Sequence, residues 1–394
     1  MGGDFVVRLK RNLLCTLVAV IVLITQLSVT ALGAELNFDI PAESAILIDA
    51  NTGQILWQKN AHKPLPPASI TKIMTMLLVM EAVDSGRVSL DDVVTVSEHA
   101  KSMGGSQVYL ATGEKITLEN LMKAIAIASG NDASVAAAEY ISGTESAFVR
   151  LMNQRAQELG MRDTVFYNSS GLPEEEGKGN ITTAYDISIM ARELLKHPKV
   201  LEWTSTRIDS IRNGEFILHN TNTLIGSYEG ADGLKTGHTD EAGYCLVATA
   251  KRGDTRLISV VLRTESPEAR VNQTIRLFDF GFNAFTPQTA VKKGEEVGTV
   301  RVSGAKRLDN PVVAANSLTV LVPKGDPDAL QGRFVPSGQL KAPLEADTQV
   351  GKYVVTVAGN PAGEVPVVTA SEVPQANIFV RFFRWLWELV SRLF

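Results

Sequence analysis

The pattern of apolar and polar residues predicts a domain in which helices and strands are mixed. Two short apolar runs flank an Asn-Thr-Gly turn within residues 46–57, which predicts a β-hairpin. Residues 73–80 are apolar on every side of a helix, which predicts a helix buried in the middle of a domain. The runs 244–250 and 257–262 flank a polar turn and predict paired antiparallel strands. We therefore expect an α/β (α+β) domain in which helices flank an antiparallel sheet.

The pattern changes near residues 285–287. After this point, short β-rich runs at 297–302, 318–322 and 353–357 are separated by Gly, Pro and Asp turns, which predicts a small β-sandwich. A chain of 394 residues is long enough for more than one domain. Because this second region carries no catalytic constellation, we expect it to be a spacer or a partner-binding module.

The first 34 residues have the composition of a secretory signal peptide. Basic residues near the start (Arg8, Lys10 and Arg11) precede an apolar core at 13–29 and several small residues. We expect export across the cytoplasmic membrane and a mature chain that begins near residue 35. The apolar core is slightly long for a signal peptide, so an uncleaved membrane anchor is the alternative interpretation.

The end of the chain predicts an amphipathic helix. From Asn377 onward the polar residues form a narrow stripe spaced by three and four, and the remainder is aliphatic and aromatic. The segment is short and interrupted by charges, so we expect it to lie on the outer face of the membrane rather than to span it. Packing on the protein's own surface is the alternative. The preceding residues 361–374 are rich in Pro, Val and small residues, which is typical of a linker.

These patterns divide the chain into four parts. They are a signal peptide (1–34), a catalytic domain (35–286), a β-rich domain (287–370), and a linker with the amphipathic helix (371–394).

Charge and composition exclude several classes of protein. The formal net charge is −5 and becomes about −7 without the signal peptide, so nothing favours nucleic-acid binding. The five histidines are scattered and there are no cysteine pairs, so we expect neither a metal site nor a cofactor. Cys15 lies in the signal peptide, which leaves Cys245 as a single thiol in an apolar strand, where we expect it to fill core space rather than to perform chemistry.

Three short polar motifs stand in order along the chain. They are Ser69-Ile-Thr-Lys72, Ser129-Gly130-Asn131 and Lys235-Thr236-Gly237. A serine hydroxyl is a weak nucleophile at neutral pH, and a lysine amine can act as its base. If the helix begins at the first motif, Ser69 and Lys72 lie one turn apart on the same face.

The surroundings of the motifs favour this chemistry. Burial should push Lys72 toward the neutral, proton-accepting form, while Lys235 should stay charged if it meets a substrate carboxylate. The second motif falls between helical runs at 118–128 and 133–141, in a loop able to face the nucleophile. Gly237 should allow a substrate backbone to approach closely.

Each motif alone is a weak signal, but the set is specific. Ser-x-x-Lys, Ser-x-Asn and Lys-Thr-Gly in this order are typical of penicillin-binding proteins and class A β-lactamases. Over residues 40–370 the chain resembles the D-alanyl-D-alanine carboxypeptidases of the low-molecular-mass, penicillin-binding protein 5 type (peptidase family S11). The matching stretches are 67–75, 128–133, 159–166, 171–172, 183–186 and 233–239.

The resemblance implies roles for the catalytic residues. Ser69 would be acylated by the penultimate D-Ala carbonyl of a peptidoglycan stem pentapeptide, with release of the terminal D-Ala. Lys72 would take the Ser69 proton, and Ser129 would relay a proton to the leaving amine. The backbone N–H groups of Ser69 and His238 would form the oxyanion hole. β-Lactams would inhibit by acylating Ser69.

The resemblance also implies substrate-binding residues. Asn131 would hydrogen-bond the substrate backbone, and Lys235, Thr236 and Gly237 would line the strand beside it, with the first two holding the terminal carboxylate. Arg270 would assist with that carboxylate, although a solvated surface charge is an alternative interpretation of this residue.

Three alternatives remain at this point. A β-lactamase-like hydrolase would need a deacylating glutamate, and the only candidate pair, Glu176 and Asn180, falls in a charged, glycine-rich segment that is better interpreted as an exposed loop. Gly130 also stands where class A β-lactamases have aspartate. A non-catalytic wall-binding or β-lactam-sensing protein, and an endopeptidase that cuts cross-links, are the others.

Overall fold

The structure is a computed structural model that describes residues 38–173 and 179–383. The predicted signal peptide, the candidate residue Glu176 and residues 384–394 of the predicted amphipathic helix lie outside these ranges.

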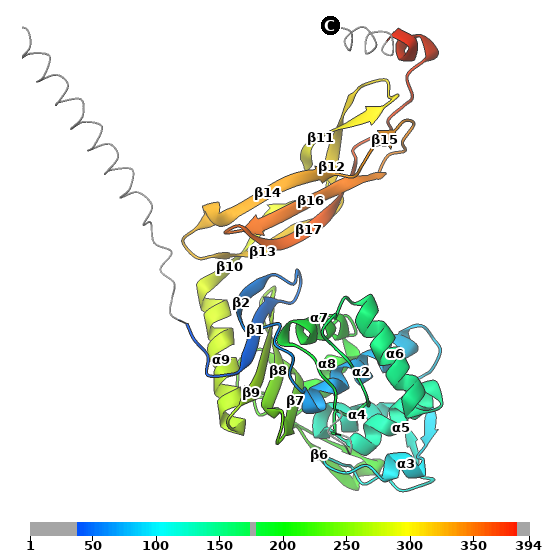
Figure 1. Ribbon diagram of the computed structural model, residues 1–394, viewed down its shortest axis with the longest axis vertical. Helices are drawn as coiled ribbons and strands as arrows, with labels where there is room; N and C mark the ends of the chain where they lie inside the picture. Colours follow the sequence, from blue (N-terminus) through cyan, green and yellow to red (C-terminus); the bar gives the residue numbers. More distant parts are fainter. Residues whose placement is uncertain (1–37, 174–178, 384–394) are drawn as a thin grey trace, which may run out of the picture. The chain divides into compact units, whose positions relative to one another are not determined.

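A five-stranded antiparallel sheet forms the centre of the first domain (Figure 1). Its order is β2-β1-β9-β8-β7, with β1 (Ser44–Asp49), β2 (Ile55–Lys59), β7 (Ala231–Thr239), β8 (Gly243–Arg252) and β9 (Thr255–Thr264). The hairpin of β1 and β2 and the pairing of β8 with β9 agree with the sequence analysis. β7 is an edge strand, and within the described residues its only partner in this sheet is β8.

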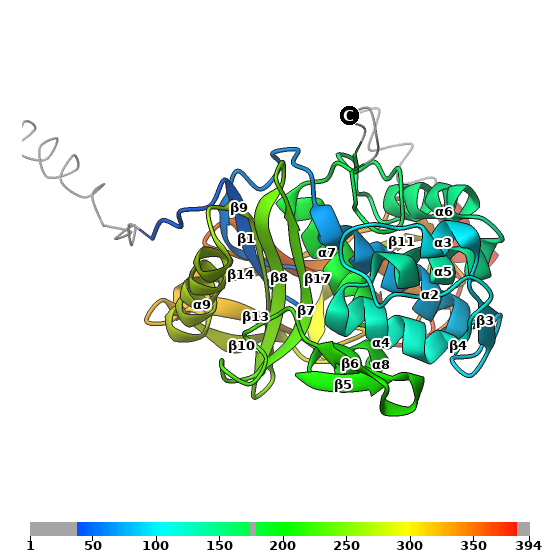
Figure 2. The same cartoon turned by 90° about the horizontal axis from the view of Figure 1, so that it is seen from below.

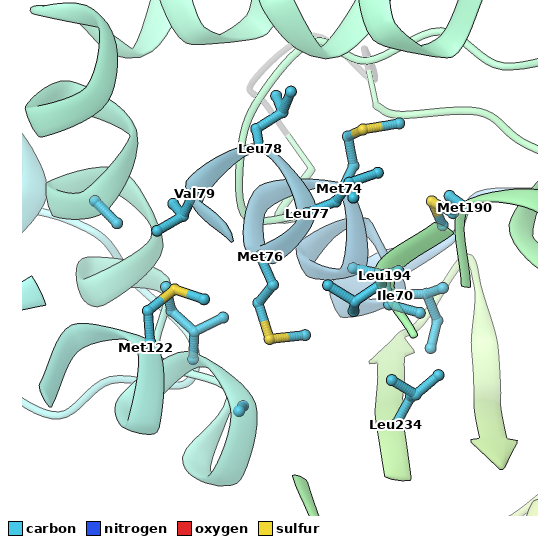
Figure 3. Packing of buried hydrophobic residues seen from close by; sticks show 14 of the residues in the cluster. Ile70, Met74, Met76, Leu77, Leu78, Val79, Met122, Met190, Leu194 and Leu234 are labelled. Atoms are coloured by element: carbon cyan, nitrogen blue, oxygen red, sulfur yellow. The ribbon is translucent and has the colours of Figure 1, made fainter. Parts of the chain in front are cut away.

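Helix α2 (Lys72–Asp84) lies at the middle of a helical layer on one face of this sheet. Every residue of α2 from Lys72 to Met80 is buried, which explains why its apolar residues show no preferred side. Around it lie α4 (Leu118–Ala128), α5 (Asn131–Ser142), α6 (Glu145–Glu158) and α7 (Ala184–Leu194). Figure 3 shows Met76 and Leu77 of α2 in the shared apolar cluster with Met122 and Met190.

The opposite face of the sheet is covered by one long helix, α9 (Pro267–Ala284), as Figure 2 shows. The smaller elements of the domain are η1 (Ala68–Thr71), β3 (Val93–Thr95), α3 (Glu98–Lys101), β4 (Lys115–Thr117), α8 (Lys199–Thr204), β5 (Ile208–Ile211), η2 (Arg212–Gly214) and β6 (Phe216–His219).

The C-terminal part is a β-rich domain with two sheets. A six-stranded sheet has the order β14-β16-β17-β12-β11-β15, and β10 pairs with β13. The elements are β10 (Phe285–Val291), β11 (Glu296–Ser303), β12 (Asp309–Ala314), β13 (Leu318–Pro323), η3 (Pro327–Ala329), β14 (Leu330–Pro336), β15 (Leu340–Lys341), β16 (Gln349–Val357) and β17 (Asn360–Thr369). One apolar cluster joins side chains of β10, β13, β16 and β17. The predicted fold class, a mixed domain followed by a β domain, is confirmed.

The prediction of a linker at residues 361–374 is wrong. Residues 360–369 form β17, an interior strand that pairs with both β12 and β16. Beyond it, Val373 bridges to Leu344 and Gln375 bridges to Ala305, so the chain stays attached to the domain. The composition misled because the two prolines of β17 occupy exposed or half-buried positions, while Ala362, Val365 and Val367 are buried.

The predicted amphipathic helix is described only in its first turns, residues 378–383. Among the residues that the structure describes, no helix is both long and apolar enough to cross a membrane.

Candidate active site

The nucleophile candidate Ser69 lies in the short 3-10 turn η1, directly before α2. Ala68, the residue before it, has a positive φ of 48°, which is a strained conformation for a residue with a side chain. Lys72 is the first residue of α2, and its Nζ lies 2.9 Å from the Ser69 Oγ. The predicted one-turn spacing therefore brings the hydroxyl and the amine into hydrogen-bond contact.

The hydrogen-bond partners of Lys72 favour its action as a base. Its side chain is fully buried, and Nζ lies 2.7 Å from both the Asn131 Oδ1 and the Ser170 carbonyl oxygen. Those two oxygens can only accept hydrogen bonds, whereas the Ser69 hydroxyl can also donate one. A neutral amine that donates to both oxygens therefore directs its lone pair at the Ser69 proton.

The electrostatics favour that neutral form. Burial, followed by the nearby charge of Lys235, holds the pKa of Lys72 well below its ordinary value. The carboxylate of Asp132 acts in the opposite direction. Lys72 is thus prepared to accept a proton at a pH where an exposed lysine could not.

The second motif joins α4 to α5. Ser129 ends α4 in a left-handed conformation, with φ 64° and ψ 30°, and Asn131 begins α5. The Asn131 Nδ2 donates to the Gly104 carbonyl at 2.7 Å, so its amide is oriented with the oxygen toward Lys72. The carboxylate of Asp132 accepts from the backbone N–H groups of Val108 and Leu110, which anchors the neighbouring loop.

The third motif lies on the edge strand β7. Lys235 is buried, and this burial, followed by the charge of Arg270, lowers its pKa to about 7. The Thr236 hydroxyl lies 2.7 Å from that of Thr221. The structure therefore places two buried lysines, from α2 and from β7, close enough for the charge of Lys235 to lower the pKa of Lys72.

The chain's own packing also requires glycine at position 237. A β-carbon at this position would lie 2.8 Å from the Pro67 carbonyl oxygen and 3.1 Å from the Ile70 side chain. The space beside Gly237 is thus filled by the chain's own nucleophile turn. The absence of a side chain lets β7 and η1 come together.

His238 and Arg270 both contact Tyr244 near the end of β7. The exposed His238 ring stacks on Tyr244, with ring centroids 4.1 Å apart. Arg270, on α9, donates to the Gly237 carbonyl at 3.2 Å and to that of Cys245 at 3.4 Å, and its guanidinium lies 5.7 Å from the Tyr244 ring centre. Arg270 is half-buried, so the interpretation as a solvated surface charge is wrong.

Two family models match the chain. One, of the S11 peptidases, D-alanyl-D-alanine carboxypeptidase, covers residues 29–266, and the other, of the penicillin-binding protein 5 C-terminal domain, covers residues 285–375. The chain belongs to the D-alanyl-D-alanine carboxypeptidase family. The resemblance drawn from the motifs, and the enzyme class it implied, are therefore confirmed.

Individual relatives of this carboxypeptidase match over most of their length. The D-alanyl-D-alanine carboxypeptidase DacF of Bacillus subtilis is 42% identical over 347 residues, which cover 87% of this chain and 88% of the relative. The crystal structure of penicillin binding protein 5 from Haemophilus influenzae has 29% identity and a TM-score of 0.76, covering 86% of this chain and 99% of its own. Penicillin-binding protein D2 of Listeria monocytogenes, solved in an ampicillin-bound form, has 36% identity and a TM-score of 0.58 over 62% of this chain and 99% of its own.

The sequence analysis assigned no role to a buried loop beside the turn that carries Ser69 in this carboxypeptidase. Ser170 supplies the carbonyl that binds Lys72, and Gly171 packs on the backbone of Ala68. Asn168 accepts from the Gly171 N–H at 2.7 Å and donates to the Leu172 carbonyl at 2.7 Å, which fixes the turn. The only sequence signal was the family resemblance at 171–172.

At Asn180 itself, the expectation of an exposed position is wrong. Only 3% of this residue is exposed. Its Nδ2 donates to the Thr71 hydroxyl at 2.9 Å, and its Oδ1 accepts from the Tyr167 N–H at 2.6 Å and from the Asn168 N–H at 3.2 Å. A buried amide needs such partners, so the polar, glycine-rich sequence around it was a poor guide to its exposure. Among the described residues, no cluster of His, Cys, Asp or Glu could hold a metal ion.

Proposed function

We propose that Ser69 is the nucleophile of this carboxypeptidase and that Lys72 is its base. The observation that carries the proposal is the hydrogen-bond geometry of Lys72, in which the Ser69 hydroxyl is the one neighbour of Nζ able to give up a proton. The family's name gives the bond that is cut, between two D-Ala residues, and the substrate we propose is the peptidoglycan stem pentapeptide that ends in them.

Acylation follows from this arrangement. The Ser69 oxygen attacks the carbonyl carbon of the penultimate D-Ala while Lys72 takes the hydroxyl proton. The carbonyl oxygen becomes an anion, which the backbone N–H groups of Ser69 and His238 would stabilise. When the C–N bond breaks, the terminal D-Ala leaves as an amine, and Ser129 relays a proton to its nitrogen.

Deacylation restores the enzyme. Water attacks the ester carbon, Lys72 accepts one of its protons, and the bond to Ser69 breaks with the proton returned to the serine oxygen. The products are the peptide shortened by one D-Ala and the free enzyme.

The terminal carboxylate of the substrate is the group that the third motif would hold. Lys235 and Thr236 would bind it from β7 and Arg270 from α9, while Asn131 and the backbone at Gly237 position the peptide. A substrate carboxylate beside Lys235 would raise the pKa of that lysine above about 7 and keep it charged in the complex.

β-Lactams would acylate the same serine. The Listeria relative was solved in ampicillin- and cefotaxime-bound forms, which supports covalent inhibition of this enzyme as well. We expect slow hydrolysis of that adduct, because Asn180 is tied to Thr71 and to backbone N–H groups rather than presented to a water molecule. Intact-mass spectrometry of the penicillin-treated protein over hours would measure this lifetime, and rapid recovery of the free mass would favour a β-lactamase.

The location of the enzyme is a further part of the proposal. The signal peptide would export the chain, and the C-terminal amphipathic helix would hold it at the outer face of the cytoplasmic membrane, with residues 35–286 and 287–370 as catalytic and β-rich domains. Ile378, Phe379 and Phe383 in its first turns are exposed, which supports a lipid-facing role. Cell fractionation with and without residues 377–394 tests this, since an unchanged membrane fraction would contradict it.

The decisive experiment is D-alanine release from a purified stem pentapeptide by the mature chain. Ser69→Ala should abolish release, whereas Ser85→Ala, which alters an exposed serine at the other end of α2, should retain it. If release continued in Ser69→Ala, Ser69 would not be the nucleophile. A folded protein that binds penicillin covalently but releases no D-alanine would indicate a sensor, or an endopeptidase that acts on cross-links.

A further inference from the structure

A groove of about 850 Å³ lies at one end of the β-rich domain. Its walls come from the end of β11, from β15 with the loop before it, and from residues 375–382. We call it the distal groove. Figure 1 shows β11 and β15 at the end of the domain from which the chain continues into the helical turns of residues 378–383.

The floor of the distal groove is apolar and open to water. Leu308 and Leu340 contribute from the domain, and Ile378 and Phe382 contribute from the helical turns. Leu308 is 40% exposed, Phe382 54% and Ile378 75%. Contiguous exposed apolar side chains of this kind mark a surface that is covered by something other than water.

The rim of the distal groove is basic. Arg301, Lys341 and Arg381 line it, all three are exposed, and the lining contains no acidic side chain. Asp309 lies 3.7 Å from Arg301, but both partners are largely solvent-exposed, so this pair neutralises the rim weakly. Positive charge gathers here although the whole chain has a formal charge of −5.

This combination identifies the chemistry of the occupant. A nucleic acid would satisfy the basic rim but not the aliphatic and aromatic floor, and an ordinary apolar protein surface would bring no negative charge to the rim. An anionic phospholipid offers both a phosphate for the rim and acyl carbon for the floor.

We propose that the distal groove binds the anionic phospholipids of a membrane surface, so that the β-rich domain itself contacts the bilayer. The inference rests on the proposed membrane attachment and adds a second site to it. Because Ile378 and Phe382 share the groove with β11 and β15, the helical turns and the strand ends present one continuous surface to the lipid.

The test is co-sedimentation of the mature chain with vesicles of phosphatidylglycerol and phosphatidylcholine, compared with phosphatidylcholine alone. The double variant Arg301→Gln/Lys341→Gln should weaken binding to the anionic vesicles by about 25-fold, since each basic residue near such a surface contributes roughly fivefold. The matched control is Lys292→Gln/Lys293→Gln, which removes two exposed charges near the opposite end of β11 and should bind as the wild type does. D-Alanine release should be unchanged in both.

The outcomes separate the two proposals. Equal binding by the wild type and the Arg301/Lys341 variant would contradict lipid binding by the distal groove and leave the helix as the only membrane attachment. Equal binding of the wild type to both vesicle types would also overturn it, because charge would then play no part. A wild type that binds neither vesicle would overturn the membrane attachment as well. A concentration-dependent dimer that the double variant abolishes would assign the groove to a second copy of the chain.

Discussion

Gly171 lies directly against the carbonyl group of Ala68, so close that a β-carbon on Gly171 would be 1.9 Å from the Ala68 oxygen and 2.8 Å from the Thr71 hydroxyl. Gly171 also has a φ of +82°, which only glycine adopts without strain. The loop that supplies the Ser170 carbonyl to Lys72 is therefore in backbone contact with the turn that carries Ser69. Ser69 and Lys72, the proposed nucleophile and base, are thus positioned by one contact between two distant parts of the chain.

Gly171→Ala should disrupt this contact between the two segments. The new methyl group must displace the Ala68 carbonyl, so we expect the thermal unfolding temperature to fall by several degrees and acylation by a fluorescent penicillin to slow by at least about tenfold. Gly179→Ala is the matched control, because a β-carbon there meets no atom within 4 Å and its φ is not in the left-handed region. Acylation at the wild-type rate in Gly171→Ala would show that the contact does not position Ser69.

Asn131→Asp should change the pH at which Lys72 becomes a base. The Asn131 Oδ1 lies 2.7 Å from Nζ, and a carboxylate there would raise the pKa of Lys72, whose pKa is otherwise held low. The acid limb of kcat/KM should move to higher pH, with roughly tenfold less activity below it per pKa unit. A variant that loses activity equally at every pH would assign Asn131 to substrate binding alone.

Arg270→Ala should instead change the alkaline limb of the pH profile of kcat/KM. Arg270 helps to lower the pKa of Lys235 to about 7, so its removal should raise that pKa and keep Lys235 charged to higher pH. We expect a higher KM for the peptide together with an alkaline limb displaced upward. Arg276→Ala, which removes an exposed arginine from the same helix, is the control and should alter neither. A higher KM with an unmoved alkaline limb would contradict the electrostatic part of the argument.

Lys235→Met should stabilise the unliganded enzyme in a pH-dependent way. In the folded state Lys235 releases its proton near pH 7, whereas in the unfolded chain it keeps the proton up to about 10.5. Between these values the unfolded state binds more protons, so wild-type stability rises with pH, at most by about 1.4 kcal/mol per pH unit. The advantage of the variant should therefore be largest below pH 7 and shrink toward pH 10, as urea unfolding at pH 6, 8 and 9.5 would measure. An advantage independent of pH would show that Lys235 is not buried as a charged group in acid.

The sequence predicted the parts of the site that rest on local patterns. The apolar run after Ser69 predicted a buried helix because it has no polar side, and the three-residue spacing then placed Lys72 beside Ser69. The β-hairpin at 46–57 and the loop between α4 and α5 were likewise local signals.

The parts that could not be predicted depend on contacts between distant segments. Nothing in a polar, glycine-rich stretch shows that Asn180 will be buried against Thr71, more than a hundred positions earlier in the chain. β17 resembled a linker because the segment is rich in proline, valine and small residues, although its pairing with two neighbouring strands is what makes it a strand. Gly237 was expected to let a substrate approach closely, but its close packing against η1 was visible only once η1 was folded against β7.

β7 ends the five-stranded sheet, and one row of its backbone groups has no neighbouring strand among the described residues. An extended peptide can add itself to such an edge as a further strand. Recognition of this kind uses main-chain groups that every residue shares, and the discriminating contacts are left to the free carboxylate at the end of the peptide. Comparing kcat/KM across stem peptides that differ at the third residue would measure how far this holds. An enzyme that bound its substrate in this way would identify it by where the peptide stops and would tolerate variation in the residues that precede that end.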